Sequence, residues 1–259
     1  MRYSFTVKEI TKDTALKMIK SFHYSNTLPK INKVFLGFFL GGELRGVITL
    51  GYGVRPVHTI RKLFPSLSTA DYLEIGRMCM TDDMPRNSES QMLSQCVEWL
   101  RKHRPDVKVL FTWADGMLGK VGYVYQASGF MYAGSSPSDI YILDGYKIHP
   151  RQTAAFFREG DTDKRITARP TIEQQRQYGI DQYKGNQYKY IRFLCCKTMK
   201  TKLMHEALFE QGLAFPKDKD LAWRVQDKET GKYVKCGRPP YKTDFSKHHG
   251  LYVLKDKLI

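Results

Sequence analysis

One unit near the middle of the chain restricts the fold more than any other feature. Residues 72–80 alternate in polarity as a β-strand does, and a polar turn segment follows them. Residues 89–103 then carry apolar side chains at helical spacing, and Pro105 ends that helix. Residues 107–113 form a β-rich run suited to a buried strand. A strand, a helix and a strand in this order predict a layered α/β domain with a right-handed crossover.

The segments on either side supply further elements of such a domain. Residues 11–22 are a helix candidate, and Thr11 and Asp13 offer N-cap oxygens. Two apolar runs, residues 34–40 and 44–50, flank Gly41-Gly42, which is a strong signal for a β-hairpin. The other expected elements of this half are a turn at 114–116, a helix at 121–128 with Gly129 as its C-cap, and strands at 130–133 and 140–143.

Composition and cysteine usage narrow the class of protein. Apolar residues make up 42% and aromatic residues 13% of the 259 residues, which argues against global disorder. The longest apolar runs are far too short to span a bilayer, and the first residues lack the apolar stretch of a secretory signal. Five cysteines without a CxxC pair indicate reduced thiols and give no zinc-ligand spacing. We therefore expect a soluble protein of the cytoplasm.

The whole chain has a formal net charge of +16, and this positive charge is concentrated in its second half. Residues 1–146 carry 18 Lys and Arg against 13 Asp and Glu, a net of +5, whereas residues 147–259 carry 24 against 13, a net of +11. This excess indicates a polyanionic partner, with nucleic acid favoured over an anionic membrane; a simply basic globular protein is the alternative.

The change in composition also predicts the domain organisation. We expect a catalytic domain at residues 1–147 and an ordered, irregular basic extension at 148–259 that packs partly on it and contributes to DNA binding. Within the extension, residues 188–196 are a strand candidate and residues 200–211 a basic helix candidate.

The polar turn before the residue 89–103 helix is a candidate anion site. Free backbone N–H groups and the positive end of the helix dipole attract anions at such a point. Arg86 and Ser88 are placed to add a charge and a hydroxyl, although Asn87 or Ser88 can equally serve only as the N-cap. Ser90 either binds the same ligand or is an ordinary residue of the helix interior.

The order of hairpin, strand, polar loop, helix and strand, followed by Tyr125-x-x-x-Gly129-Phe130, resembles the GNAT superfamily of acyltransferases. The resemblance implies a central mixed, largely antiparallel, splayed sheet flanked by helices. It also implies that Tyr125 is a general acid to the leaving thiolate; packing of its ring under the sheet is the alternative. The family's phosphate loop carries glycines, whereas residues 86–91 contain none, which argues against acetyl-CoA as the donor.

A narrower resemblance covers residues 20–135 and, more loosely, 185–216. The motifs in their order are His23-Tyr24-Ser25, Leu28-Pro29, Val34-Phe35, Gly41-Gly42-Glu43-Leu44, Pro85-Arg86-Asn87-Ser88-Glu89-Ser90, Ala114-Asp115 and Gly122-Tyr123-Val124-Tyr125-Gln126-Ala127. Together they are similar to the phage Mom family. This resemblance implies conversion of adenine in DNA to N6-carbamoylmethyl-adenine, which protects phage DNA from restriction.

The residue patterns and the resemblance together assign the expected site residues to three groups. The catalytic residues are His23, Tyr24, Ser25, Asp115 and Tyr125. The donor-binding residues are Arg86, Asn87, Ser88 and Ser90. The substrate-binding residues are Arg77, Tyr188, Lys189 and Tyr190. His23 could be a base, a substrate contact or, with Tyr24, a ligand of iron, and the identity of the donor stays open.

Several of these residues have an equally simple structural interpretation. Arg77 on its strand lines either a central cleft or the solvent face. Asp115 lies either among ligands at a strand end or in a turn before Gly116. The tyrosines of residues 178–190 either stack on unpaired bases or pack in strands and loops.

The expected partner is double-stranded DNA with the target adenine flipped out of the helix, because the N6 amine must be exposed to react. A homodimer is an open alternative to a monomer. Two other functions remain as rivals: a CoA-dependent N-acetyltransferase acting on a small amine or a protein, and a non-catalytic DNA-binding protein on the same scaffold.

Overall fold

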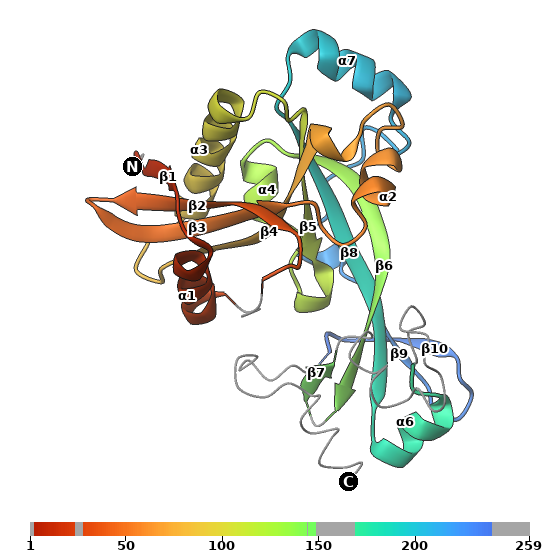
Figure 1. Ribbon diagram of the computed structural model, residues 1–259. Coiled ribbons are helices and arrows are strands. Elements are labelled where there is room, and N and C mark those ends of the chain that lie inside the picture. Colours follow the sequence, from red (N-terminus) through yellow and green to blue (C-terminus); the bar gives the residue numbers. More distant parts are fainter. Residues whose placement is uncertain (1–2, 24–27, 144, 149–168, 240–259) are drawn as a thin grey trace. The chain divides into compact units, whose positions relative to one another are not determined.

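The computed structural model describes residues 3–23, 28–143, 145–148 and 169–239 (Figure 1). The strands are β1 (Thr6–Glu9), β2 (Asn32–Leu40), β3 (Glu43–Gly51), β4 (Tyr72–Met80), β5 (Val109–Asp115), β6 (Met131–Leu143), β7 (Tyr146–Ile148), β8 (Asp181–Phe193), β9 (Trp223–Gln226) and β10 (Tyr233–Cys236). The α-helices are α1 (Lys12–Phe22), α2 (Pro56–Arg61), α3 (Ser88–His103), α4 (Tyr123–Ala127), α6 (Ile172–Tyr178) and α7 (Lys197–Glu206). Short 3₁₀ turns lie at Thr69–Asp71, Gly116–Leu118 and Asp218–Asp220. None of the helices in these described ranges is long and apolar enough to cross a membrane.

The strands form a mixed sheet with mostly antiparallel pairs. Its main order is β1-β2-β3-β4-β5-β8-β6-β7, and β9 and β10 continue from β8. Strand β1 pairs with β2, β2 with β3, β3 with β4, β6 with β7, β8 with β9 and β9 with β10, all antiparallel. Strands β4 and β5 are parallel and are joined by the crossover helix α3. The expected α/β class, with a largely antiparallel mixed sheet and flanking helices, is therefore confirmed.

The first hairpin follows directly from its turn residues. Gly41 and Gly42 have φ angles of 61° and 86°, which a glycine pair adopts without steric penalty in a type I′ turn. The expected helix before it is also present, and the Thr11 side chain caps α1 by accepting the Thr14 N–H at 3.2 Å.

Contacts divide the chain into two compact units that alternate along the sequence. The first comprises residues 1–114, 122–134 and 188–215; the second comprises residues 115–121, 135–187 and 216–259. Strands β5, β6 and β8 contribute residues to both. The expected boundary between residues 147 and 148 stays a prediction, because residues 149–168 lie outside the described part of the chain.

In the first unit, helices cover both faces of the sheet. Figure 1 shows α1 and α3 on opposite sides of β2 and β3. Residues Ala15, Met18 and Ile19 of α1 pack on Val47 of β3 and Cys79 of β4. The face with α3 carries Gly46, where an added Cβ would lie 2.5 Å from the sulfur of Met92.

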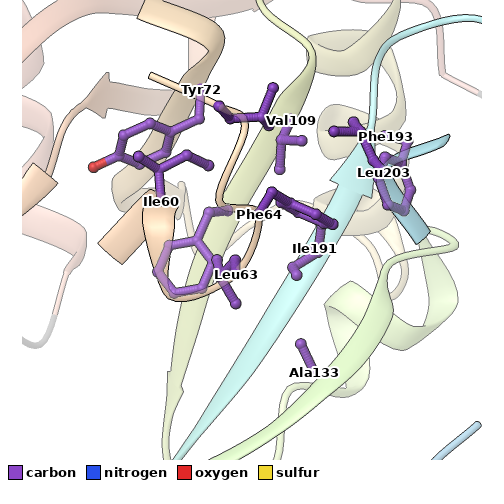
Figure 2. Packing of buried hydrophobic residues seen from close by; sticks show 11 residues of the cluster. Ile60, Leu63, Phe64, Tyr72, Val109, Ala133, Ile191, Phe193 and Leu203 are labelled. Atoms are coloured by element: carbon purple, nitrogen blue, oxygen red, sulfur yellow. The ribbon is translucent and has the colours of Figure 1, made fainter. Parts of the chain in front are cut away.

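A second apolar cluster fills the same unit around α2 and α7 (Figure 2). Its buried members are Ile60, Leu63, Phe64, Leu67, Tyr72, Val109, Phe111, Ala133, Ile191, Phe193 and Leu203. They come from β4, β5, β6 and β8, from α2 and the segment after it, and from α7, so segments far apart in the sequence meet in one core. Full burial of side chains of this size is worth about 1.5–3 kcal/mol each.

The second unit has its own small core. Met117, Ile140 and Ile142 are buried, and Tyr183 and Trp223 pack against them. The buried Gln175 of α6 donates to the Gln226 side chain at 3.1 Å, which ties that helix to β9.

The structure differs from the sequence-based expectation mainly in the second half. Strands expected at 130–133 and 140–143 are one continuous strand, β6, whose exposed stretch around Ser135 and Pro137 obscures the apolar pattern. Strand β8 begins at Asp181 rather than at residue 188, and α7 ends at Glu206 rather than at 211. The turn expected at 114–116 begins two residues later, at Gly116, because β5 extends to Asp115.

Candidate functional site

The candidate site lies in the first unit, where β4 and β5 separate. Their parallel pairing joins Tyr72 to Val109 and ends at Glu74 with Phe111. Both strands continue beyond these residues, β4 to Met80 and β5 to Asp115. Such a splay leaves backbone groups of two adjacent strands without strand partners at the same point, which favours binding of another molecule there.

A β-bulge determines which side chains meet beside this splay. Thr49 of β3 is paired with Arg77 of β4, whereas the next residue, Leu50, is paired with Ile75. Gly76 is therefore an extra residue in β4. In a regular strand residues 74 and 77 would point to opposite faces, but with the bulge both point to the face that carries Thr49.

That face has a polar strip between two apolar clusters. The α1 cluster includes Val47 and Cys79, which lie two residues from Thr49 and Arg77 on their strands. The other cluster includes Tyr72, two residues from Glu74. Thr49, Glu74 and Arg77 thus form a polar strip between the two apolar clusters on this face of the sheet.

Glu74 supplies the carboxyl group of this strip, and the pKa of that group is shifted. Burial raises its pKa to about 7, and the positive charge of Arg77 limits the rise. The carboxylate lies against the backbone at Gly53, where an added Cβ would be 2.1 Å from Oε2. Because Gly53 also has a φ of 68°, glycine is needed there both for space and for backbone conformation.

Two buried oxygen atoms beside Gly76 lack hydrogen-bond partners within the described residues. They are the hydroxyl of Thr49, which is fully buried, and Oδ1 of Asn32. A Cβ at Gly76 would lie 3.1 Å from the first and 3.3 Å from the second. The Asn32 amide group donates to the Pro29 carbonyl, so its oxygen is held in place. Unsatisfied buried oxygens are costly, and a bound donor group would satisfy them.

The loop before α3 keeps one feature of a glycine-containing phosphate loop. Asn87 has a φ of 72°, the only positive φ among described residues other than glycine. Asparagine tolerates this left-handed conformation better than other residues with a side chain. Asn87 occupies the N-cap position of α3, but its side chain makes no capping hydrogen bond.

The hydroxyls of this loop are engaged locally. Ser88 is buried and donates to the Pro85 carbonyl at 2.7 Å, and Ser90 donates to the Asn87 carbonyl at 2.8 Å. Arg86 is exposed. The donor-binding role of Arg86, Asn87, Ser88 and Ser90 stays a prediction.

Tyr125 flanks the splay from the face opposite to Glu74. It forms a side-chain hydrogen bond with Thr112 of β5, the residue after Phe111, so it lies on the α3 side of that strand. Burial and the charge of Glu89 raise the pKa of Tyr125, and the bond to Thr112 lowers it in part. The phenol is therefore neutral at neutral pH, as a proton donor must be.

The expected substrate residues Tyr188 and Tyr190 are buried. The Tyr190 ring lies 5.4 Å from that of Tyr125 and 5.7 Å from that of Tyr132, and its hydroxyl accepts from Gln126 at 3.0 Å. These contacts correspond to the packing alternative, and a stacked base would have to displace them. Lys189 is half-buried, and burial lowers its pKa. A role of these three residues in substrate binding stays a prediction.

The roles of the remaining catalytic candidates stay predictions. His23 is half-buried and ends α1, with its backbone N–H bonded to the Ile19 carbonyl at 3.0 Å. Tyr24 and Ser25 lie outside the described residues. Asp115 belongs to the second unit, accepts the Met117 N–H at 3.0 Å and lies 3.6 Å from the amine of Lys147.

Iron has no complete ligand set among the described residues. They contain no group of three or more His, Cys, Asp or Glu side chains that could hold a metal ion. We therefore assign no chemical step to iron.

The site includes four residues that the sequence did not single out, namely Asn32, Thr49, Glu74 and Thr112. Glu74 had a usable signal, because a carboxylate between the apolar residues Leu73 and Ile75 of an expected strand is unusual. The other three are small polar residues in strands, and only the fold shows that they lie beside the splay.

Comparison with known structures finds acetyltransferases. A Bacillus subtilis acetyltransferase in complex with CoA aligns with a TM-score of 0.40 and 12% identity over 74% of this chain and 100% of its own. The IAA acetyltransferase from Bacillus cereus aligns with a TM-score of 0.40 and 14% identity over 73% and 99%. At these values nothing about donor or substrate follows from the alignments.

Comparison of sequences is decisive. The model of the Mom protein family matches residues 4–211, which include β1 to α7 and therefore the entire splay. The methylcarbamoylase mom of Escherichia phage Mu is 36% identical over 200 residues, which are 76% of this chain and 80% of that protein. A family match of this extent, with a relative at this identity, shows that the chain belongs to the Mom protein family.

Proposed function

We propose that this protein converts adenine in DNA to N6-carbamoylmethyl-adenine and thereby protects phage DNA from restriction in the cytoplasm of the host. As a member of the Mom family the chain is a DNA-modifying transferase. The single observation that carries the finer proposal is the 36% identity, over most of both chains, to a protein named methylcarbamoylase.

The product defines what the site must do. One N6–H bond of adenine is replaced by a bond to the CH2 carbon of a carbamoylmethyl group, so the amine gives up a proton during the reaction. The N6 lone pair is delocalised into the ring, so the amine is a poor nucleophile and must be oriented closely against its electrophile. We propose that the base is flipped out of the duplex for this purpose.

We propose that Glu74 accepts the proton from N6. It is the last paired residue before the strands separate, and it shares a face with Arg77 and the unpartnered hydroxyl of Thr49. A base with a pKa of about 7 is half ionised at neutral pH, the condition in which proton transfer is most effective. Arg77 stabilises the carboxylate form, and Thr49 and Asn32 can accept hydrogen bonds from an amine or amide placed beside Gly76.

We propose that Tyr125 acts on the opposite face of the sheet. Its neutral phenol can give a proton to the group that leaves the donor, while Glu74 takes one from the acceptor. A base and an acid on the two sides of one splay divide the two proton transfers between two residues.

The test is direct. The protein is expressed in bacteria lacking any related activity, plasmid DNA is digested to nucleosides, and these are analysed by mass spectrometry. We expect modified deoxyadenosine with the wild type, a large loss with Glu74→Gln or Tyr125→Phe, and no loss with the exposed-lysine control Lys102→Gln. Unmodified deoxyadenosine from soluble wild-type protein in several hosts would exclude the proposal.

A second candidate, CoA-dependent acetyl transfer, is favoured by one observation. Asn87 supplies a left-handed residue at the N-terminus of the 16-residue helix α3, as a glycine of a phosphate loop would. Calorimetry with acetyl-CoA distinguishes the two functions, since micromolar binding would support this candidate. A protein that binds DNA and yields neither product would be the non-catalytic rival.

A further inference from the structure

The strongest unassigned feature of the second unit is a row of three basic residues across three adjacent strands. Lys184 of β8 is paired with Arg224 of β9, and Arg224 is paired with Lys235 of β10. Directly paired residues of antiparallel strands point to the same face, so the three side chains form one row. With neighbouring strands about 4.8 Å apart, the row extends over about 10 Å.

The opposite face of these strands is anchored in the core, which fixes the direction of the row. Tyr183, next to Lys184, and Trp223, next to Arg224, pack against the buried Met117, Ile140 and Ile142. An added Cβ at Gly185, the residue after Lys184, would lie 2.3 Å from the Met117 sulfur. Because successive side chains alternate, the basic row faces away from this core.

The row is not neutralised by acidic neighbours. Within the described ranges, none of Lys184, Arg224 and Lys235 forms a salt bridge. Other basic residues of the same unit are engaged: Lys228 pairs with Asp181 at 2.7 Å, and Arg238 donates to the Leu118 carbonyl at 2.8 Å. Arg224 and Lys235 are exposed and Lys184 is half-buried.

Like charges directly opposite each other destabilise a sheet, so this arrangement favours a bound polyanion. The Lys184 amine lies 3.6 Å from the centre of the Tyr233 ring, a contact that holds this cation in place at the side of the row. Pre-ordered cations lose less side-chain entropy when they bind.

We infer that Lys184, Arg224 and Lys235 bind the phosphate backbone of the DNA substrate, and this inference rests on the proposed function. Contacts to phosphates supply affinity and fix position without reading sequence, so recognition of the base is left to another part of the protein. Lys184 of the row lies on the same strand, β8, as Tyr188 and Tyr190, whose role in substrate binding stays a separate prediction.

The experiment measures binding of a fluorescent duplex oligonucleotide by anisotropy as salt is raised from about 50 to 200 mM. The test variant is Lys184→Gln/Arg224→Gln/Lys235→Gln. The matched control is Lys12→Gln/Lys17→Gln/Lys102→Gln, which removes the same charge from exposed helix positions of the first unit. Far-UV circular dichroism of both confirms folding, and Lys184→Arg/Lys235→Arg keeps the charge in the row.

The row variant should bind roughly tenfold or more weakly at 0.1 M salt, and its log–log salt slope should be smaller by about 2–3, since each lost phosphate contact removes about 0.9. The control and the arginine variant should keep the wild-type slope. Equal slopes for the row variant and the control would overturn the inference, as would binding of the row to anionic vesicles with no change in DNA affinity.

The two proposals fail separately. If the row variant binds DNA more weakly but the wild-type protein leaves deoxyadenosine unmodified, the inference about the row is supported and the proposed chemistry is refuted. If the wild-type protein modifies DNA but the row variant binds DNA as tightly as the control, only the inference about the row is refuted.

Discussion

The titration of Glu74 makes the stability of the protein depend on pH in a way that one substitution can isolate. Burial raises its pKa from 4.5 to about 7 in the folded protein, whereas in the unfolded chain the group keeps its ordinary value. Below pH 4.5 the carboxyl is protonated in both states, and the raised pKa then contributes its full stabilisation. As the pH rises, the unfolded chain loses its proton first, so this contribution falls and vanishes above about pH 7.

The magnitude follows from the size of the shift. One pKa unit corresponds to about 1.36 kcal/mol, so the free energy of unfolding should lose about 2.5 kcal/mol through this group between pH 5 and pH 8. Other groups titrate in the same range, and a comparison with Glu74→Gln removes their contribution. Glutamine has nearly the same shape and no titrating group, so the difference between the two proteins reports on Glu74 alone.

The assay is urea unfolding followed by circular dichroism at several pH values. The wild type should lose about 2.5 kcal/mol relative to Glu74→Gln between pH 5 and pH 8. A carbon-13 NMR titration of the Glu74 carboxyl should give a midpoint near the same pKa of about 7. A stability difference that is constant with pH, or a midpoint near 4.5, would refute the argument that burial controls this carboxyl.

Three further predictions concern the loop, the bulge and the acid. Asn87→Ala should destabilise by about 1–2 kcal/mol in thermal unfolding while Asn87→Gly does not, because only the alanine is strained at a φ of 72°; equal effects would contradict this. Gly76→Ala should cost about 1–3 kcal/mol in urea unfolding, since its Cβ would crowd Pro29 at 2.8 Å and Thr49 at 3.1 Å; an unchanged midpoint would show that the strands can yield. Tyr125→Phe should lose most modified deoxyadenosine in the nucleoside assay yet change stability by only about 1 kcal/mol, the worth of its bond to Thr112; full activity would exclude it as the acid.

Much of the first unit could be predicted because local chemistry and fold agree there. The glycine pair specifies the first hairpin, and the apolar stripe of residues 89–103 specifies α3 to within one residue. The second unit was harder, because its strands are short or carry polar side chains on an exposed face. Residues 181–187 of β8 include Asp181, Lys184 and Asn186 and do not form an apolar run.

Part of the candidate site could be predicted from the sequence. Tyr125 and Arg77 were singled out, and both lie at the splay of β4 and β5. Regular strand alternation would put Glu74 and Arg77 on opposite faces, and only the bulge, which cannot be read from the sequence, brings them to the same face. The burial of Tyr188 and Tyr190 also could not be read from the sequence, because tyrosines suit a packed strand as well as a binding surface.

The bulge in β4 makes the chemistry of this strand depend on how it pairs with β3 as well as on the identity of its residues. If Gly76 paired regularly with β3, Glu74 would turn to the face covered by α3, although no residue would have changed. Loss of the single codon for Gly76 would have the opposite outcome, because Glu74 and Arg77 would then be two residues apart and regular alternation would keep both on the face of Thr49. A shorter strand can therefore preserve this arrangement of side chains, whereas a strand of the same length without the bulge cannot.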